Sequence, residues 1–150
     1  IVNPYITLTI GIRKALNRAL RRGVRLQIML STKNDGPVVP DVAGIEMRKL
    51  QKRGAEIYYY EGGFHHSKVM MIDSTFCTIG TTNLDGRSLK YDYEVNSFIF
   101  DEEPTRELQR IFQKDVDERC TLLTDSVWKA RFTCKRRIRG YIYEIIRGVL

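Results

Sequence analysis

The sequence lacks any apolar run close to the roughly 20 residues that a helix needs to cross a bilayer, and its first residues lack the order of a signal peptide. It has only 3 cysteines, an odd number, with no Cys-x-x-Cys pair. A disulfide framework and a zinc site are therefore not expected. We expect Cys77, Cys120 and Cys134 to be buried or half-buried structural thiols in a reducing compartment, in a chain that is itself soluble.

The length and composition predict one domain. A chain of 150 residues with 43% hydrophobic content can bury one substantial core but not two. The first residues, Ile1–Tyr5, resemble a strand already under way, and the sequence begins without methionine. We therefore expect residues 1–150 to form a single domain that is a fragment of a longer protein.

The positive charge is concentrated at the carboxyl end. Residues 125–150 carry seven basic and two acidic side chains, a net charge of +5, which leaves +2 of the total +7 for residues 1–124. An apolar stripe runs along the same segment: Ile138, Tyr141, Ile142, Ile145, Ile146 and Val149. This basic helical tail fits either an interfacial helix on anionic lipid or a helix packed on the domain with a solvated basic face. The commonness of such core stripes favours the second interpretation.

The first half of the chain alternates between strand and helix patterns. Strands are expected at Ile1–Tyr5, Val24–Leu30 and Ala55–Tyr60, and apolar residues recur at helical spacing between them. Each helical pattern ends in basic residues and a glycine, as helix ends often do. The alternation predicts βαβ units, and with them an α/β fold whose mixed, largely parallel central sheet is flanked by helices.

The rhythm changes after Gly62. Short strands are expected at Ser67–Ile72, Phe76–Gly80 and Glu94–Phe100, and the first two are close enough to form a hairpin. A helix is expected to open at Pro104, and the segment from about Asp125 is also expected to be helical.

The strand pattern that begins at Ser67 sets two reactive side chains side by side. Successive side chains of a strand point to opposite faces, so His66 and Lys68 share one face and His65 lies on the other. An ammonium can bind the oxygens of a phosphate, while an imidazole can attack phosphorus or move a proton near neutral pH. Asp73 has the opposite parity and is expected to be a structural anion near the strand end.

The next strand pattern ends in residues that could complete an oxyanion site. Gly80 allows a close approach of backbone, and Thr81 and Asn83 share parity, so that a hydroxyl and an amide could reach the same oxyanion. Glu94 could accept the other ring N–H of His66 and thereby fix its tautomer.

These residues together resemble a known family. The pattern His66-x-Lys68-x4-Asp73-x6-Gly80-Thr81-x-Asn83 is similar to the HKD signature of the phospholipase D superfamily. The runs from Asn83 to Ser88 and from Tyr93 to Asn96 resemble the carboxyl-terminal half of bacterial cardiolipin synthases in particular. Two positions depart from that pattern: Thr81 stands where serine is more common, and Asp92 stands where asparagine is more common.

The resemblance implies a phospholipase D-like sandwich and a set of roles. His66, Lys68, Asp73 and Glu94 would be catalytic, and Lys68, Thr81 and Asn83 would bind the substrate phosphate. No cofactor and no metal are implied. The family's mechanism uses two histidines on opposite sides of one phosphorus. Because His65 faces away, the second histidine must come from another half of the same polypeptide or from a second copy of the chain.

The resemblance further implies a phosphatidyltransferase that makes cardiolipin from phosphatidylglycerol through a phosphohistidine, with residues 1–150 as one HKD half. The expected partners are the anionic phospholipid and the membrane surface, on the cytoplasmic side of the bacterial inner membrane. One alternative is a homodimeric nuclease or other phosphodiesterase, although nucleic acid is not the expected partner. The other is a non-catalytic module that binds anionic membrane through residues 125–150.

Overall fold

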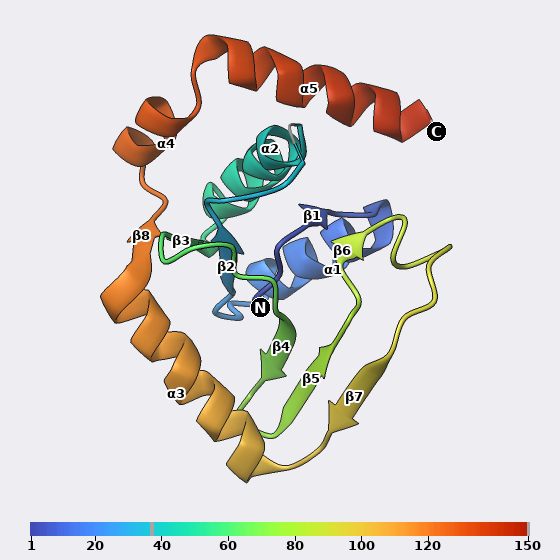
Figure 1. Ribbon diagram of the computed structural model, residues 1–150, viewed down its shortest axis with the longest axis vertical. Coiled ribbons are helices and arrows are strands. Elements are labelled where there is room, and N and C mark those ends of the chain that lie inside the picture. The colour runs from blue at the N-terminus through green and yellow to red at the C-terminus, as the bar shows by residue number, and fades with distance from the viewer. Residues whose placement is uncertain (37, 150) are drawn as a thin grey trace.

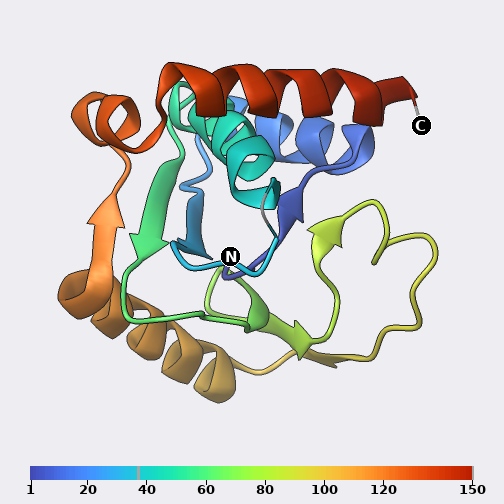
Figure 2. The ribbon, with the colours of Figure 1, turned by 45° about the horizontal axis from the view of Figure 1, so that its top comes forward.

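The computed structural model describes residues 1–36 and 38–149, of which residues 146–149 by their backbone only. Strands lie in the middle of the molecule, with α1 (Ile10–Arg21) and α2 (Val39–Gln51) on one side and α3 (Glu102–Arg119) on the other (Figure 1). Turned forward, the molecule shows a further helix lying across α2 on the side away from the strands (Figure 2). The predicted sandwich of helices and strands is confirmed.

The first half folds as the predicted βαβ unit. Strands β2 (Gln27–Ser31) and β3 (Glu56–Tyr60) pair in parallel, with Gln27 opposite Glu56 and α2 as the crossover. Ahead of them, α1 begins at its cap Thr9, whose side chain accepts a hydrogen bond from the Ile12 backbone N–H at 3.4 Å. After α1, Gly23 adopts φ 81°, a left-handed conformation that favours glycine and ends the helix.

The second half is an antiparallel meander. Strands β4 (Lys68–Ile72) and β5 (Phe76–Gly80) form the predicted hairpin, and β7 (Asn96–Ile99) pairs with the far side of β5. Lys68, Gly80 and Asn96 are directly opposite one another in this register. Between β5 and β7, the short β6 (Leu84–Asp85) runs parallel to β1 (Ile6–Thr7).

Two sheet predictions need correction. The sheet is mixed, but parallel pairing is limited to β2–β3 and β1–β6 among the described residues, whereas the other paired strands are antiparallel, so it is not largely parallel. The predicted strand Ile1–Tyr5 is also wrong, because Pro4 has no N–H to donate to a ladder. Val2 alone forms bridges, parallel to Met29 and antiparallel to Val69, and so joins the two halves of the sheet.

The carboxyl end begins with α3, whose cap residue Asp101 accepts a hydrogen bond from the Glu103 backbone N–H at 2.9 Å. It continues through β8 (Cys120–Leu122), antiparallel to β3, and the short helix α4 (Asp125–Arg131) to the long helix α5 (Cys134–Val149). The expectation of buried or half-buried thiols holds for Cys77 and Cys120, but Cys134 is exposed at the start of α5. No helix among the described residues is long and apolar enough to span a membrane.

Two apolar clusters fill the two faces of the sheet. The larger one lies between β2–β3 and the helices α1 and α2, and it includes Trp128 and Phe132 from the carboxyl end. The smaller one lies between the sheet and α3, where Phe112 packs with Val2 and Met29. Because the residues around β2 and β3 contribute to both clusters, this part of the sheet is fixed from both sides.

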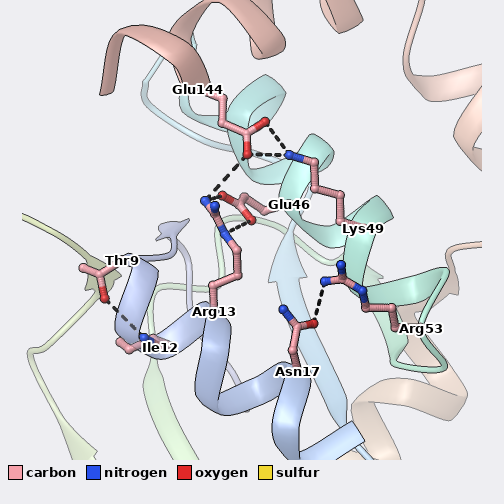
Figure 3. A network of polar contacts seen from close by, with 8 residues as sticks. All are labelled: Thr9, Ile12, Arg13, Asn17, Glu46, Lys49, Arg53 and Glu144. Atoms are coloured by element: carbon pink, nitrogen blue, oxygen red, sulfur yellow. Dashed lines mark hydrogen bonds and ion pairs between the residues drawn. The ribbon is translucent and has the colours of Figure 1, made fainter. Parts of the chain in front are cut away.

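Helix α5 packs on α2 through charge rather than through its apolar stripe. Asp41 of α2 is 1% exposed and forms ion pairs with Arg136 and Arg139, while Glu144 pairs with Lys49. Figure 3 shows the far end of this contact, where Arg13 from α1 pairs with both Glu46 and Glu144. The tail therefore packs on the domain, as favoured above, but its arginines face inward.

The apolar side chains of α5 consequently face solvent. Ile138, Tyr141, Ile142 and Ile145 are all exposed, whereas a domain-packing helix with a solvated basic face would bury them. Ile146 and Val149 of the predicted stripe lie outside the described side chains.

Candidate active site

The structure brings His66 and Lys68 together, as their parity predicts. The Lys68 ammonium lies 3.1 Å from His66 Nδ1 and 2.9 Å from Nε2, and it donates to the His66 carbonyl at 2.9 Å. Both residues sit at the start of β4, where the chain crosses from β3 into the antiparallel half of the sheet. The ring nitrogen of a neutral imidazole can accept a proton or form a bond to phosphorus.

The two side chains differ in their access to solvent. His66 is exposed, whereas Lys68 is 9% exposed. Burial lowers the pKa of Lys68 from its ordinary value of 10.5, and the nearby negative charge of Glu94 opposes this shift. Among the described residues, no carboxylate forms an ion pair with this ammonium within 4.0 Å. A buried cation without a paired carboxylate is a favourable place for an oxyanion to bind.

Two aromatic rings orient His66, and neither was identified from the sequence. The Tyr5 ring meets the imidazole edge-on at a centroid distance of 5.8 Å, and the Phe64 ring is tilted against it at 5.1 Å. Tyr5 is in turn anchored by donating its phenolic proton to Asp35, and burial with this bond raises the pKa of Tyr5 to about 12. Phe64 shares parity with His66 and Lys68, which is the signal that could have revealed it.

Gly80 lies opposite Lys68 on the neighbouring strand, and Asn83 lies in the segment that follows this strand. A Cβ at Gly80 would clash with the Asn96 side chain and the Val95 carbonyl, as the predicted close approach of backbone requires. Asn83 Nδ2 donates to Ser88 Oγ at 3.4 Å, while Asn83 Oδ1 is buried with no partner within the described residues. The amide is therefore only loosely held.

Asn3 holds the turn that carries Asn83, and this role was also missed from the sequence. Asn3 is buried; its Nδ2 donates to the Thr82 carbonyl at 3.3 Å, and its Oδ1 accepts from the Leu84 backbone N–H at 3.3 Å. The two bonds straddle Asn83. Asn3 therefore fixes the backbone on both sides of a predicted phosphate-binding residue.

The expected hydrogen bond between His66 and Glu94 is not found. Glu94 instead accepts a hydrogen bond from the Thr81 hydroxyl, which itself accepts from the Val95 backbone N–H at 3.0 Å. The cause is local: Thr81 pairs with Val95, which brings the Thr81 side chain next to Glu94. The Thr81 hydroxyl thus donates to Glu94 here, and its predicted bond to phosphate would replace this one.

Asp73 lies apart from the cluster. It is exposed at the far end of β4, five residues from Lys68, a separation of roughly 16 Å along an extended strand. Asp73 and Ser74 adopt φ 50° and 57° in the β4–β5 turn, a left-handed conformation that aspartate tolerates better than most residues. This position fits the structural anion expected from parity and gives no contact for a catalytic role.

His65 points to the other face, as predicted. Its ring contacts Tyr60 at a centroid distance of 4.9 Å, and its Nε2 lies 3.9 Å from Asp115 Oδ2 on α3. Burial lowers the pKa of His65, while the negative charge of Asp115 opposes that shift. His65 and His66 therefore lie on opposite sides of the segment that enters β4.

Across residues 1–36 and 38–149, no three His, Cys, Asp or Glu side chains gather as a metal ion would require.

The comparison with protein families gives a match over most of the chain. Residues 1–116 match the family described as cardiolipin synthase, PLD-like domain, and the chain belongs to this family. Cardiolipin synthase 1 of Staphylococcus epidermidis is 37% identical over 129 residues, which are 86% of this chain and 26% of that protein. The chain spans about a quarter of the length of the curated relatives it matches.

Solved structures share the fold. The chain is similar to a phosphatidylserine synthase from Haemophilus influenzae with a TM-score of 0.71 and 13% identity, over 99% of this chain and 39% of that one. It is also similar to Nuc, a phospholipase D family member from Salmonella typhimurium, with a TM-score of 0.69 and 19% identity, over 83% of this chain and 80% of that one. At these identities the likeness concerns the fold alone.

Proposed function

We propose that this chain supplies one of two HKD halves of a phosphatidyltransferase that makes cardiolipin from phosphatidylglycerol. The observation that carries the proposal is the contact of the Lys68 ammonium with both ring nitrogens of His66, without a paired carboxylate within the described residues. Membership of the cardiolipin synthase family supports the choice of substrate.

The reaction proceeds in two displacements. In the first, an imidazole nitrogen attacks the phosphorus of phosphatidylglycerol, an N–P bond forms, the P–O bond to the headgroup glycerol breaks, and a second histidine protonates the departing alkoxide. In the second, that histidine takes the proton from a headgroup hydroxyl of another phosphatidylglycerol. The hydroxyl oxygen then attacks phosphorus, the P–N bond breaks, and cardiolipin is released.

The residues of this chain serve the phosphoryl group throughout. Lys68 donates to the non-bridging oxygens, where negative charge develops in the transition state. The Asn83 amide and the Thr81 hydroxyl complete the cradle, with the bond from Thr81 to phosphate replacing its present bond to Glu94. His66 is one of the two histidines, as nucleophile or as acid and base. The second comes from the other HKD half or from a second copy of the chain.

The decisive experiment assays the longest polypeptide that contains this chain with phosphatidylglycerol in mixed micelles. Lipid chromatography should show cardiolipin and free glycerol in equal amounts. His66→Gln should abolish both products, and Lys68→Gln should slow them strongly. The matched control is Lys90→Gln, which removes a lysine from an exposed loop site. Glycerol release without cardiolipin would show hydrolysis instead of transfer, and no reaction of the lipid would refute the proposal.

The homodimeric phosphodiesterase is the second candidate. One observation favours it: the chain covers 80% of Nuc, so a chain of similar length makes up most of a phospholipase D family protein. A symmetric dimer would pool two copies of His66 across a twofold axis. Digestion of DNA by the chain alone, with no lipid product, would establish this alternative over the transferase.

The proposed setting is the surface of the bacterial inner membrane on its cytoplasmic side. The support for it is the family match and the bacterial source of the relatives. Anionic phospholipid is the proposed partner, and nucleic acid is not.

A further inference from the structure

Helix α5 carries an apolar stripe that the domain leaves uncovered. Ile138, Ile142 and Ile145 follow one another at helical spacing and are 57%, 49% and 70% exposed. Ile138 and Ile142, together with Tyr143, border an open groove whose remaining walls are Lys135 and Arg139. Large aliphatic side chains scattered singly on a surface are ordinary, but a continuous row along one helix marks an interaction site.

The opposite side of α5 is fixed by specific contacts, so the stripe cannot simply turn inward. Arg136 and Arg139 both reach the buried carboxylate of Asp41, and Glu144 is bonded to Lys49. Gly140 sits directly on α2, where an added Cβ would lie 2.7 Å from the Asp41 carbonyl oxygen. Rolling the helix by half a turn would break these ion pairs and leave Asp41 buried without a cation.

The charges around the stripe identify what it fits. Lys135 and Arg139 border the isoleucines, and Tyr141 lies on their other side. The carboxylate of α5, Glu144, is turned inward, so no acidic side chain stands on the outer face among the described residues. An apolar centre with cations and tyrosine at its edges complements the boundary between anionic headgroups and acyl chains.

We propose that the outer face of α5, formed by Lys135, Ile138, Ile142 and Ile145, is a docking surface for an anionic lipid bilayer. The isoleucines enter the acyl boundary while Lys135 contacts lipid phosphates, and Arg139 at the edge of the groove stays paired with Asp41. The helix lies flat on the surface and does not cross the membrane.

This surface is separate from the predicted catalytic cluster. Helix α5 lies on the side of α2 that faces away from β4 in both ribbon views (Figure 1, Figure 2). Docking through α5 therefore anchors the domain through the side of α2 that lies away from β4. The proposal does not rest on the transfer reaction, and vesicle binding can be measured with no turnover.

The test is co-sedimentation of the 150-residue chain with sucrose-loaded vesicles. Equimolar phosphatidylglycerol and phosphatidylcholine vesicles should bind the chain, pure phosphatidylcholine vesicles should bind it weakly, and high salt should reduce binding to the anionic vesicles. Ile142→Glu should lower the partition coefficient by roughly tenfold or more, because it places a carboxylate where apolar area meets the lipid. A second variant, Lys135→Glu at the edge of the stripe, should weaken binding to anionic vesicles alone.

The matched control is Ile111→Glu on α3. Ile111 is 50% exposed, close to the exposure of Ile142, and the helix that carries it, α3, lies across the sheet from α5 (Figure 1). This variant should keep nearly all vesicle binding. Circular dichroism melting of all three variants should give the wild-type Tm, which separates loss of docking from loss of fold.

Three results would overturn the proposal. The first is wild-type chain that does not bind anionic vesicles. The second is equal loss of binding in Ile142→Glu and Ile111→Glu. The third is light scattering that shows a wild-type dimer which Ile142→Glu dissociates, because a second copy of the chain would then cover the stripe.

Discussion

Buried charge occurs in two regions of this molecule, and it is arranged in opposite ways. Between α2 and α5, the carboxylates of Asp41, Glu46 and Glu144 are each matched by arginine or lysine. At the start of β4, the buried ammonium of Lys68 contacts an imidazole and a carbonyl, and its pKa is lowered by burial. The first region is neutralised from within the chain, whereas the second keeps its positive charge for a ligand.

The difference separates charges that hold the fold from charges that bind. A buried ion pair that loses one partner leaves an uncompensated charge and destabilises the protein. A buried cation without a paired carboxylate already destabilises the fold in this way. An oxyanion that binds to it therefore gains a favourable electrostatic interaction at no further desolvation cost to the cation. Changes in the α2–α5 region should therefore alter stability, and changes in the β4 region should alter activity.

The largest effect is expected at His66. His66→Gln should lower phosphatidyl transfer by about 10³-fold or more, because it removes a group that bonds or protonates at phosphorus. Since His66 is exposed, the free energy of unfolding should change by less than about 0.5 kcal/mol. Transfer is measured by lipid chromatography and stability by urea unfolding. A decrease in the free energy of unfolding large enough to explain the lost activity would show that His66, like the charges between α2 and α5, serves stability.

The next effect is expected at Asp41. Asp41→Ala should lower the free energy of unfolding by about 3 kcal/mol, because it leaves Arg136 and Arg139 without their shared carboxylate. Urea unfolding measures this change. The matched control is Asp125→Ala, whose side chain is 75% exposed in its pair with Arg48 and whose loss should cost much less. Equal costs at the two sites would show that burial of the pair does not matter.

A smaller effect is expected at the β4–β5 turn. Asp73→Ala should lower the free energy of unfolding by about 1 kcal/mol, because alanine adopts a left-handed conformation at a cost. Asp73→Gly should cost less, since glycine adopts this conformation freely. If glycine proved worse than alanine, the side chain of Asp73 and not its backbone conformation would be what matters there.

The smallest effect is expected from the pH dependence of stability. Burial lowers the pKa of His65 from its ordinary value of 6.5, so the unfolded chain takes up a proton more readily than the folded chain. Well above pH 6.5, His65 is neutral in both the folded and the unfolded chain and does not affect the free energy of unfolding. As the pH falls through and below 6.5, the unfolded chain is protonated first, so the free energy of unfolding decreases. His65→Gln should flatten this part of a curve of unfolding free energy against pH. A stability gain on acidification through His65 would contradict the direction of the shift.

Local patterns predicted much of the fold and the placement of His66, Lys68 and His65. Strand alternation fixes which side chains share a face, and helix ends marked by basic residues and glycine fix where α1 and α2 stop. The predicted strand Ile1–Tyr5 contains Pro4, and within this segment Val2 alone forms bridges, one to Met29 and one to Val69. The short strands β6 and β8 carry too few residues for any periodicity to show.

Features that depend on distant partners were not predictable from local patterns. The orientation of α5 is set by Asp41, nearly a hundred residues earlier in the chain. The apolar stripe of α5 alone does not indicate that its arginines face the domain. The bond of Glu94 to Thr81, in place of His66, depends on how the β5–β7 connection closes. The support of His66 by Tyr5 and of Asn83 by Asn3 likewise joins residues about 60 to 80 positions apart.

His66 and Lys68 are proposed to receive a phosphoryl group together, and nuclear magnetic resonance of the imidazole nitrogens during a titration with inorganic phosphate can follow this binding. The His66 signals should show saturable shifts in the wild-type chain, lose these shifts in Lys68→Met, and retain them in Lys90→Gln. His66 signals that do not move, or that move equally after Lys68 is replaced, would contradict it.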